Sequence, residues 1–287
     1  MNDAPSVRIV IKFGGEVVAR AGELLALCGD VAALADAGHA LVLCHGGGPQ
    51  ASALQQRLGV ETIKVGGRRV TDAATLQIMK CVLAGEVSID VCAAARAAGV
   101  RAVGLSGVSA GLVRAHRRPP KRVAGGGDAP VDFGLVGDID AIDTAVLQTL
   151  WRGGFVPVVN SLGVADRAPP GQPCEVYNIN ADTVAAALAA AVRADHLILV
   201  TDVPGVLRDR HDPSSVIPRL SRREAEDAIA SGVIQGGMIP KVEEALDNLS
   251  RGIGAVHILG AEPGALAQAV AAPGRRGTVL VEGGGAA

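Results

Sequence analysis

Short apolar runs alternate with helical segments along most of the 287 residues, and this alternation constrains the fold more than any other feature of the chain. The runs are continuously apolar, which is typical of strands that helices cover on both faces. Such an order predicts an α/β fold, a three-layer αβα sandwich around a mostly parallel central sheet. The predicted strands are Val7–Lys12, Ala40–Cys44, Ala102–Leu105, Phe155–Val159, His196–Thr201, Ala255–Leu259 and Thr278–Val281.

Most segments between these strands are predicted to be helical. In the first of them, apolar residues from Leu24 to Leu34 recur at helical spacing and mark its buried face. Two stretches, Lys64–Val70 and Leu112–Gly137, break the alternation and are predicted to be hairpins or excursions. The predicted helices are Leu24–Ala37, Gln50–Leu58, Ala73–Ala98, Thr144–Arg152, Ala181–Arg193, Arg222–Ser231 and Pro240–Arg251.

Composition excludes several classes of function. Aromatic residues make up only 2% of the chain, which argues against a base-stacking platform for single-stranded nucleic acid. A net charge of −2 gives no general attraction to nucleic acid or anionic membranes. No apolar run is long enough to span a membrane, and no signal-peptide pattern begins the chain. The five cysteines form no CxxC pair, so we expect a cytoplasmic protein with free thiols.

Glycine-rich turns follow predicted strands or begin predicted helices, and two of them carry a lysine. Lys12 precedes Gly14-Gly15, and Lys241 follows Gly236-Gly237 near the start of a helix. Glycine lets backbone N–H groups approach a ligand, and a helix N-terminus attracts phosphate or carboxylate. Neither of the common nucleotide-binding glycine motifs follows a strand, so a nucleotide would need another cradle. Two lysines from opposite ends of the chain therefore suggest one phosphate group held from both sides.

A serine hydrolase is an alternative that the glycine motifs also suggest. His45–Gly48 resembles an esterase oxyanion-hole signature, and Gly107–Gly111 fits G-x-S-x-G. Asp202 and His257 would follow in the order of a catalytic triad. However, a nucleophile elbow requires a helix directly after the serine, whereas Leu112–His116 alternates like a strand. The pattern favours phosphate chemistry over this alternative.

Two polar segments complete the set of candidate residues. Arg68-Arg69 lies just before a predicted helix cap, so these arginines are either solvated or hold a substrate carboxylate by a bidentate contact. Asn180 is placed as the N-cap of the predicted helix Ala181–Arg193. Capping that helix does not require Asn178 or Asp182, so these two residues are candidates for another role. An acid close to two lysines would orient them and keep both protonated.

Taken together, these motifs closely resemble the N-acetylglutamate kinases of the amino-acid kinase family. The resemblance extends over about residues 7–281 and depends on the combination rather than on any single motif. It implies the αβα fold of that family and transfer of the γ-phosphoryl group of ATP to the side-chain carboxylate of N-acetyl-L-glutamate. The product would be N-acetyl-L-glutamyl 5-phosphate, an intermediate of arginine biosynthesis. The motifs are Ile11–Gly15, His45–Gly48, Arg69–Thr71, Tyr177–Asp182, Thr201–Gly205 and Gly236–Lys241.

By position, the resemblance implies a role for each candidate residue. Lys12 and Lys241 look like the two groups that stabilise the transition state, and Asp182 looks like the residue that organises them. The positions that hold the acceptor match Gly47, Gly48, Arg69 and Asn178. The positions that hold the nucleotide match Gly14, Gly15, Thr201, Asp202, Gly236 and Gly237.

The resemblance also predicts the organisation of the molecule. Residues 1–170 would form an N-terminal lobe for acceptor binding and dimerisation, and residues 171–287 a C-terminal lobe for ATP, with one continuous sheet. Mg²⁺ would accompany ATP, held largely by phosphates and water, because no metal-ligating cluster is visible. Only six residues precede Val7, too few for the N-terminal helix of arginine-inhibited relatives. We therefore expect a homodimer that free arginine does not inhibit.

Departures from the family pattern leave the acceptor open. The usual Gly-Leu-Arg-Val-Thr appears here as Gly67–Thr71 with Arg68 in place of leucine, and Ser88-Ile89 replaces a common Asn-Lys pair. The acceptor is therefore either N-acetyl-L-glutamate or, as an alternative, N-acetyl-aminoadipate or its carrier-bound form in lysine biosynthesis. A catalytically silent amino-acid-sensing domain is a further alternative, although such a domain need not retain Lys12, Lys241 and Asp182.

Overall fold

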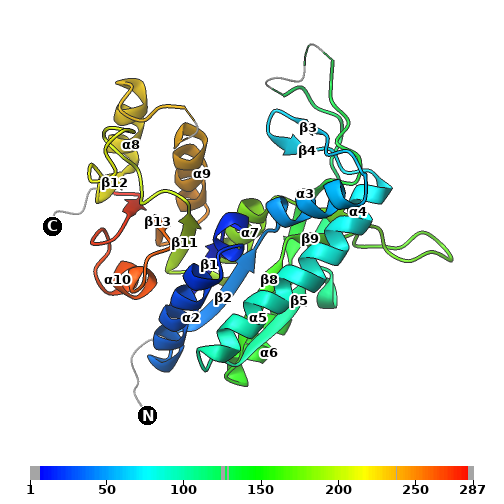
Figure 1. The fold of residues 1–287 in the computed structure, drawn as a ribbon, viewed down its shortest axis with the longest axis horizontal. Helices are drawn as coiled ribbons and strands as arrows, with labels where there is room; N and C mark the ends of the chain where they lie inside the picture. The colour runs from blue at the N-terminus through cyan, green and yellow to red at the C-terminus, as the bar shows by residue number, and fades with distance from the viewer. Residues whose placement is uncertain (1–6, 124–126, 128, 237, 284–287) are drawn as a thin grey trace.

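An eight-stranded sheet runs through the centre of the molecule (Figure 1). The computed structural model describes residues 7–123, 127, 129–236 and 238–283. All neighbouring strands from β13 to β5 are parallel, whereas β14 is antiparallel to β13, so the predicted mostly parallel sheet is confirmed. In spatial order the strands are β12 (Arg219–Ser221), β14 (Thr278–Val281), β13 (Ala255–Gly260), β11 (His196–Thr201), β1 (Arg8–Phe13), β2 (Ala40–His45), β8 (Val156–Asn160) and β5 (Ala102–Ser106).

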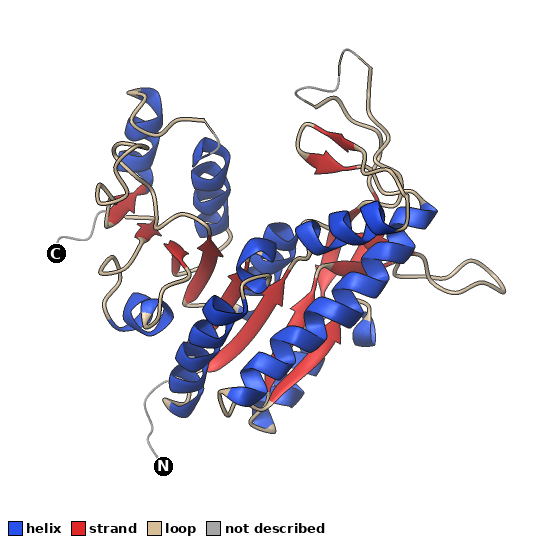
Figure 2. Cartoon of the chain, in the orientation of Figure 1, coloured by secondary structure: helices blue, strands red, loops and turns tan. Residues whose placement is uncertain are grey.

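Helices cover both faces of this sheet, and each face has its own apolar cluster (Figure 2). One cluster packs beneath α1 (Gly15–Val18), α2 (Ala21–Asp36), α3 (Gly48–Arg57), α4 (Ala73–Lys80), α5 (Ser88–Ala97) and α10 (Ala265–Ala271). The other packs beneath α6 (Ala145–Arg152), α7 (Ala181–Val192), α8 (Arg222–Ala230) and α9 (Met238–Ser250). Since both faces are buried, the strands are continuously apolar, and the three-layer αβα architecture is confirmed.

The two stretches that break the alternation form small sheets outside the central one. A hairpin of β3 (Lys64–Val65) and β4 (Arg68–Arg69) projects above the sheet. A second sheet has the strand order β10 (Val176–Asn178), β9 (Leu162–Val164), β6 (Val113–Arg117) and β7 (Gly137–Ile142). Of these strands only β6 lies within the predicted excursion, whereas β9, β10 and nearly all of β7 follow it and were not predicted.

The long helix predicted over residues 73–98 is continuous but not uniform. A π-helical segment, Cys81–Val87, joins α4 to α5. Insertions of this kind in α-helices often occur at functional sites. Here Val82, Leu83 and Val87 of the segment are buried against the glycine turn that follows β2.

The alternation of side chains along β1 directs one lysine toward a particular helical layer. Ile9, Ile11 and Phe13 belong to the cluster beneath α2, whereas Val10 belongs to the cluster beneath α7. Because successive side chains of a strand point to opposite faces, Lys12 shares the face of Val10. The lysine therefore lies at the end of β1 on the side covered by α7 and α9.

The described chain contains no helix with the length and apolar character needed to cross a membrane. The central sheet takes strands from both sides of residue 170. The division into lobes at that residue stays a prediction.

Candidate active site

Three loops meet at the carboxyl ends of β1, β2 and β11, which are adjacent in the sheet. In the register of these strands, Phe13 lies beside His45 on one side and Val200 on the other. The turn at Gly14 is held against β11 because its N–H donates to the carbonyl of Val200 at 3.2 Å. Carboxyl ends of parallel strands form the ligand-binding edge of open α/β sheets. The predicted residues at these strand ends are Thr201, which is the last residue of β11, and Gly14, Gly15, Gly47, Gly48 and Asp202, which follow the strands.

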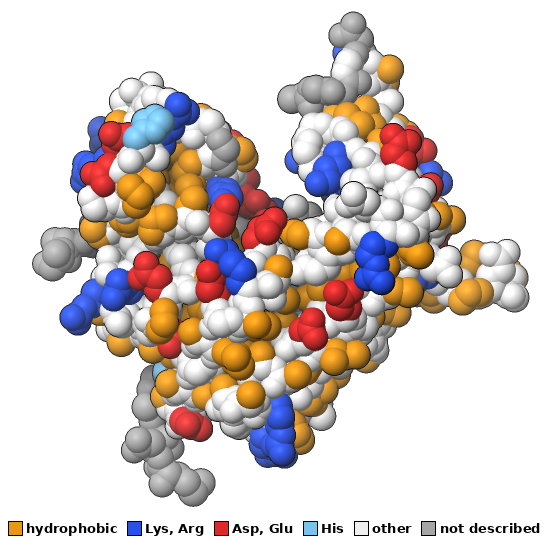
Figure 3. Space-filling model, in the orientation of Figure 1, with side chains coloured by type: hydrophobic (Ala, Val, Ile, Leu, Met, Phe, Trp, Pro, Cys, Tyr) orange, Lys and Arg blue, Asp and Glu red, His pale blue; other side chains and the backbone are white. Residues whose placement is uncertain are grey.

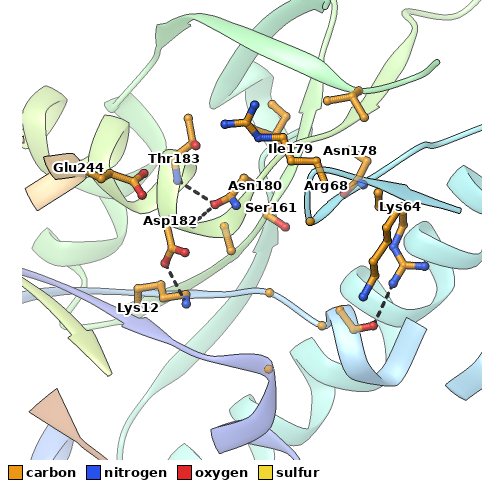
Figure 4. A pocket seen from close by; sticks show the side chains of 18 of the residues that line it. Lys12, Lys64, Arg68, Ser161, Asn178, Ile179, Asn180, Asp182, Thr183 and Glu244 are labelled. Carbon is orange, nitrogen blue, oxygen red and sulfur yellow. Dashed lines mark hydrogen bonds and ion pairs between the residues drawn. The ribbon is translucent and has the colours of Figure 1, made fainter. Parts of the chain in front are cut away.

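Lys12 and Asp182 form an ion pair at this edge. The Nζ atom of Lys12 lies 2.8 Å from Oδ1 of Asp182, and the lysine side chain is only 13% exposed. Asp182 is placed by the start of α7, where the side chain of Asn180 accepts hydrogen bonds from the N–H groups of Asp182 and Thr183. The predicted N-cap is therefore confirmed, and it fixes the backbone from which the carboxylate reaches Lys12 (Figure 4).

Lys241 is more exposed and lies near a different acid. It occupies the first turn of α9, and its Nζ atom is 4.0 Å from Oδ1 of Asp202, which follows β11. The side chains of Lys241 and Asp202 are 42% and 66% exposed. Each predicted catalytic lysine thus has its own carboxylate partner: Asp182 for Lys12 and Asp202 for Lys241.

Two cavities meet at the Lys12–Asp182 pair. The larger cavity has a volume of about 590 Å³ and contains Gly46–Gly48, Arg69 and Asn178 in its walls. The smaller has a volume of about 230 Å³ and contains Gly14, Thr201, Asp202 and Lys241. Both are lined by Lys12, Gly15, Asp182 and Glu244. Figure 3 shows the cleft between the part of the chain that carries α8 and α9 and the part that carries β3 and β4.

The larger cavity brings together every residue predicted to bind the acceptor. Arg69 of β4 donates hydrogen bonds to the side chain of Gln55, to the carbonyl of Gly48 at 3.1 Å and to Oγ of Ser52 at 2.8 Å. These contacts tie the hairpin to the start of α3. Partial burial lowers the pKa of the Arg69 guanidinium from its usual value.

Asn178 connects the same cavity to the second sheet. It is buried at the end of β10, and its Nδ2 atom donates to Oγ1 of Thr71 at 3.1 Å. Thr71 lies two residues after the end of β4 and is fully buried. A hydrogen bond between buried polar groups that are 107 positions apart fixes the hairpin base against β10.

The structure adds charged residues that the sequence did not single out. Lys64, Arg68 and Arg118 line the larger cavity from the hairpin and second-sheet side, and Glu243, Glu244 and Asp247 line it from α9. Burial raises the pKa of Glu244, and the nearby Asp182 carboxylate raises it further. Two of these residues could have been identified from their spacing in the sequence. Glu244 stands one helical turn after Lys241, and Arg68 stands next to Arg69.

Two predicted nucleotide-binding glycines are not placed at the site. Gly236 is exposed in a left-handed conformation with φ of 58°, before α9, and does not line either cavity. Gly237 lies outside the described residues. Their predicted roles stay predictions.

The arrangement needed by a serine hydrolase does not form. Ser109 begins a short 3₁₀ turn, Ser109–Gly111, that leads into β6 rather than into a helix. His257 is fully buried on β13, where its Nε2 atom lies 2.9 Å from Nδ1 of His196. Neither Ser109 nor His257 lines either cavity at the site. The glycines of His45–Gly48 line the larger cavity instead.

Known proteins resemble this chain over nearly its whole length. Residues 7–260 match the model of the amino acid kinase family. A relative from Anaeromyxobacter dehalogenans strain 2CP-C, named acetylglutamate kinase, is 50% identical over 273 residues, which cover 95% of this chain and 98% of the relative. A relative of the same name from Sorangium cellulosum strain So ce56 is also 50% identical, over 275 residues that cover 95% of this chain and 94% of the relative.

The solved structures agree on the fold at lower sequence identity. Carbamate kinase from Giardia lamblia, bound to AMP-PNP, has a TM-score of 0.67 and 18% identity, covering 97% of this chain and 99% of that chain. At this identity the likeness shows the fold alone. The family model and the two relatives together identify this chain as a member of the amino acid kinase family.

Proposed function

We propose that this protein transfers the γ-phosphoryl group of ATP to the side-chain carboxylate of N-acetyl-L-glutamate in arginine biosynthesis. The observation that carries the proposal is that two cavities meet at one lysine. A nucleotide in the smaller cavity and an acceptor in the larger would present their reacting ends to Lys12 from opposite sides. Relatives that share half of the residues bear the name acetylglutamate kinase, which supports this acceptor.

The larger cavity suits an acceptor with two negative ends. Arg69 and the start of α3 at Gly48 would hold one carboxylate, because a guanidinium and helix N–H groups both favour anions. The other carboxylate would then lie near Lys12. The amide side chain of Asn178 supplies a polar contact between these ends for the N-acetyl group.

The chemistry needs charge neutralisation rather than proton transfer. A carboxylate oxygen of the acceptor attacks the γ-phosphorus, a new P–O bond forms, and the bond to the β-phosphate oxygen breaks to release ADP. The acceptor is ionised at neutral pH, so no general base is required. Lys12 and Lys241 would stabilise the negative charge on the transferring oxygens, and Asp182 would hold Lys12 in place.

The charges of the smaller cavity fit a requirement for Mg²⁺. Its walls contain two lysines, Lys12 and Lys241, but four acids, Glu16, Asp182, Asp202 and Glu244. A polyanionic nucleotide entering this excess of carboxylates needs a divalent cation with it. The exposed Asp202 would supply one oxygen ligand, with phosphates and water supplying the others, as is usual for nucleotide-bound magnesium. Bound Mg²⁺ neutralises charge that develops on the phosphate oxygens.

A coupled assay of ADP release tests the proposal and fixes the acceptor. The purified protein is supplied with ATP, Mg²⁺ and either N-acetyl-L-glutamate or N-acetyl-aminoadipate. We expect release of ADP that depends on N-acetyl-L-glutamate and is much slower with the longer acid. Release that is independent of either acceptor, or faster with N-acetyl-aminoadipate, would contradict the assignment.

A further inference from the structure

The larger cavity has walls of opposite charge. The hairpin β3–β4 contributes Lys64, Arg68 and Arg69, whereas α9 contributes Glu243, Glu244 and Asp247. Figure 1 shows the hairpin β3–β4 and α9 in separate parts of the molecule, and the space-filling view of Figure 3 shows the cleft between these parts. Opposite charges on facing surfaces attract each other, and the attraction grows as the surfaces approach and exclude water.

Glu244 is the acid on α9 whose carboxylate is disfavoured by burial. It is half-buried, lines both cavities, and has a raised pKa, caused first by its burial and then by the Asp182 carboxylate. Within the described part of the chain, no cation lies within ion-pair distance of the Glu244 carboxylate. The nearby Lys12 is paired with Asp182 instead. A buried carboxylate without a partner is unfavourable, so a cation that reached it would stabilise that arrangement.

Arg68 is the cation best placed to do so. Its side chain extends from the hairpin across the cavity towards Thr183 and Glu244 (Figure 4). Three cations lower the pKa of the Glu244 carboxyl group, and Arg68 contributes less than Lys12 and Arg251. However, Lys12 is paired with Asp182, and Arg251 does not line the cavity. In contrast to Arg69, which is held by Gln55, Gly48 and Ser52, Arg68 makes no ion pair among the described residues.

The backbone of the hairpin holds Arg68 at the edge of the cavity. Its two strands are only two residues long each, and the turn between them, Gly66-Gly67, has positive φ at both residues. A two-residue turn of this kind joins the strands tightly, and the contacts of Arg69 tie β4 to α3, so the hairpin backbone stays in place. The ion pair would therefore form through the long side chain of Arg68.

We propose that Arg68 and Glu244 form an ion pair across the cleft when the substrates are bound, and that this pair closes the larger cavity over the acceptor. Both are positioning residues, because they act on the acceptor through closure and not by contact with the reacting atoms. The inference rests on the proposed function for the identity of the acceptor. The pairing itself rests on the two charges and on their places in the cleft.

A charge-exchange cycle tests the pair. The variants are Arg68→Glu, Glu244→Arg and the double exchange, with Glu244→Gln as a milder variant if the reversal does not fold. We expect each single reversal to raise the KM for N-acetyl-L-glutamate about tenfold, the effect of about 1.4 kcal/mol, with a smaller change in kcat. The double exchange should restore KM to within about threefold of wild type. Single effects that simply add in the double exchange would overturn the pair.

An exposed ion pair on α8 serves as the matched control. Arg223 and Asp227 lie one turn apart with side chains 92% and 76% exposed, outside both cavities. Exchanging these two charges should leave the KM for the acceptor unchanged. A comparable rise in KM would show that net surface charge, and not the Arg68–Glu244 pair, sets the affinity.

Hydrogen exchange provides a measurement that needs no turnover. With AMP-PNP, Mg²⁺ and N-acetyl-L-glutamate, we expect the amides of residues 64–69 to become protected in wild type. Arg68→Glu should abolish this protection and the double exchange should restore it. Absence of protection in wild type would overturn the closure. Absence of ADP release in wild type with protection intact would instead contradict the proposed function.

Discussion

At the scale of single residues, the contacts of each charged group indicate what it can do. Arg69 donates to Gln55, to Ser52 and to the Gly48 carbonyl, so its guanidinium is fixed before any acceptor arrives. A fixed, planar donor loses little conformational entropy when it binds a carboxylate. Its fork geometry, and not only its positive charge, should therefore determine the affinity for the acceptor.

Replacing Arg69 by lysine tests this point. Arg69→Lys keeps the charge but loses the fork that joins β4 to α3. We expect the KM for the acceptor to rise by about 10- to 100-fold, or about 1.4 to 2.7 kcal/mol, while the KM for ATP changes little. Steady-state kinetics with each substrate varied would measure both values. Arg57→Lys, at an exposed position of α3, is the control. An unchanged acceptor KM in Arg69→Lys would contradict the role of Arg69 in binding the acceptor.

A buried histidine predicts how stability depends on pH. Burial, reinforced by neighbouring His196, lowers the pKa of His257 from its usual 6.5 to about 3. The folded state therefore holds this side chain neutral while the unfolded chain takes up a proton below pH 6.5. The stability contributed by the lowered pKa is present above that pH and is lost as the pH falls from about 6.5 toward 3.

Urea unfolding at pH values from 8 to 4 measures this loss. We expect His257 to contribute up to about 1.4 kcal/mol of lost stability for each pH unit below 6.5. His196 also has a lowered pKa, which adds to the slope. His257→Gln removes the titrating group, so the free energy of unfolding should fall less steeply with acid. An equal slope in the variant would contradict the assignment.

At the scale of elements, the sequence predicted the helices and strands that have a clear local pattern of apolar residues. The seven strands of the central sheet that it predicted end within one residue of their observed bounds. It missed β12, α1 and α10, which are short elements with little periodicity. It also missed the π-helical segment, because the wider backbone turn of such a segment leaves no distinct residue pattern.

Gly47 tests the packing between the glycine turn that follows β2 and the π-helical segment. A Cβ atom at Gly47 would lie 3.0 Å from Leu83, 3.2 Å from Val87 and 3.3 Å from Val82. We expect Gly47→Ala to destabilise the protein by about 1–3 kcal/mol through overpacking and to lower kcat by shifting the turn. Thermal unfolding and the ADP-release assay measure the two effects.

Gly85→Ala is the matched control for this prediction. Gly85 lies within the same π-helical segment, but a Cβ atom there would meet nothing within 4 Å. Alanine is the better helix former, so this variant should be as stable as wild type or slightly more stable. If Gly47→Ala behaved in the same way as Gly85→Ala, the proposed packing constraint would be wrong.

At the scale of the whole molecule, function depends on contacts that no local pattern contains. The sequence indicated that Lys12 and Lys241 face one anion, and the structure places both at the smaller cavity. The sequence could not indicate that Lys241 lies next to Asp202, or that Arg68 and Glu244 line the same cavity. Such neighbours come together when segments distant in the chain fold over one sheet edge.

The open edge of the sheet bears on assembly. β5 is the last strand on its side, and Ile89 of the adjacent α5 is 64% exposed. Exposed strand edges and apolar side chains are commonly covered by a partner. We therefore expect a homodimer, and sedimentation equilibrium should give twice the chain mass of 28.9 kDa. A monomer, or a hexamer, would contradict this expectation.

The central claim is that the phosphoryl group passes at Lys12, where the two cavities meet. The most direct test compares wild type with Lys12→Met for formation of N-acetylglutamyl phosphate, trapped with hydroxylamine, and for binding of AMP-PNP by calorimetry. We expect Lys12→Met to lose about 10³-fold or more in kcat, while AMP-PNP affinity stays within about threefold. Near-normal formation of the acyl phosphate by Lys12→Met would contradict the claim.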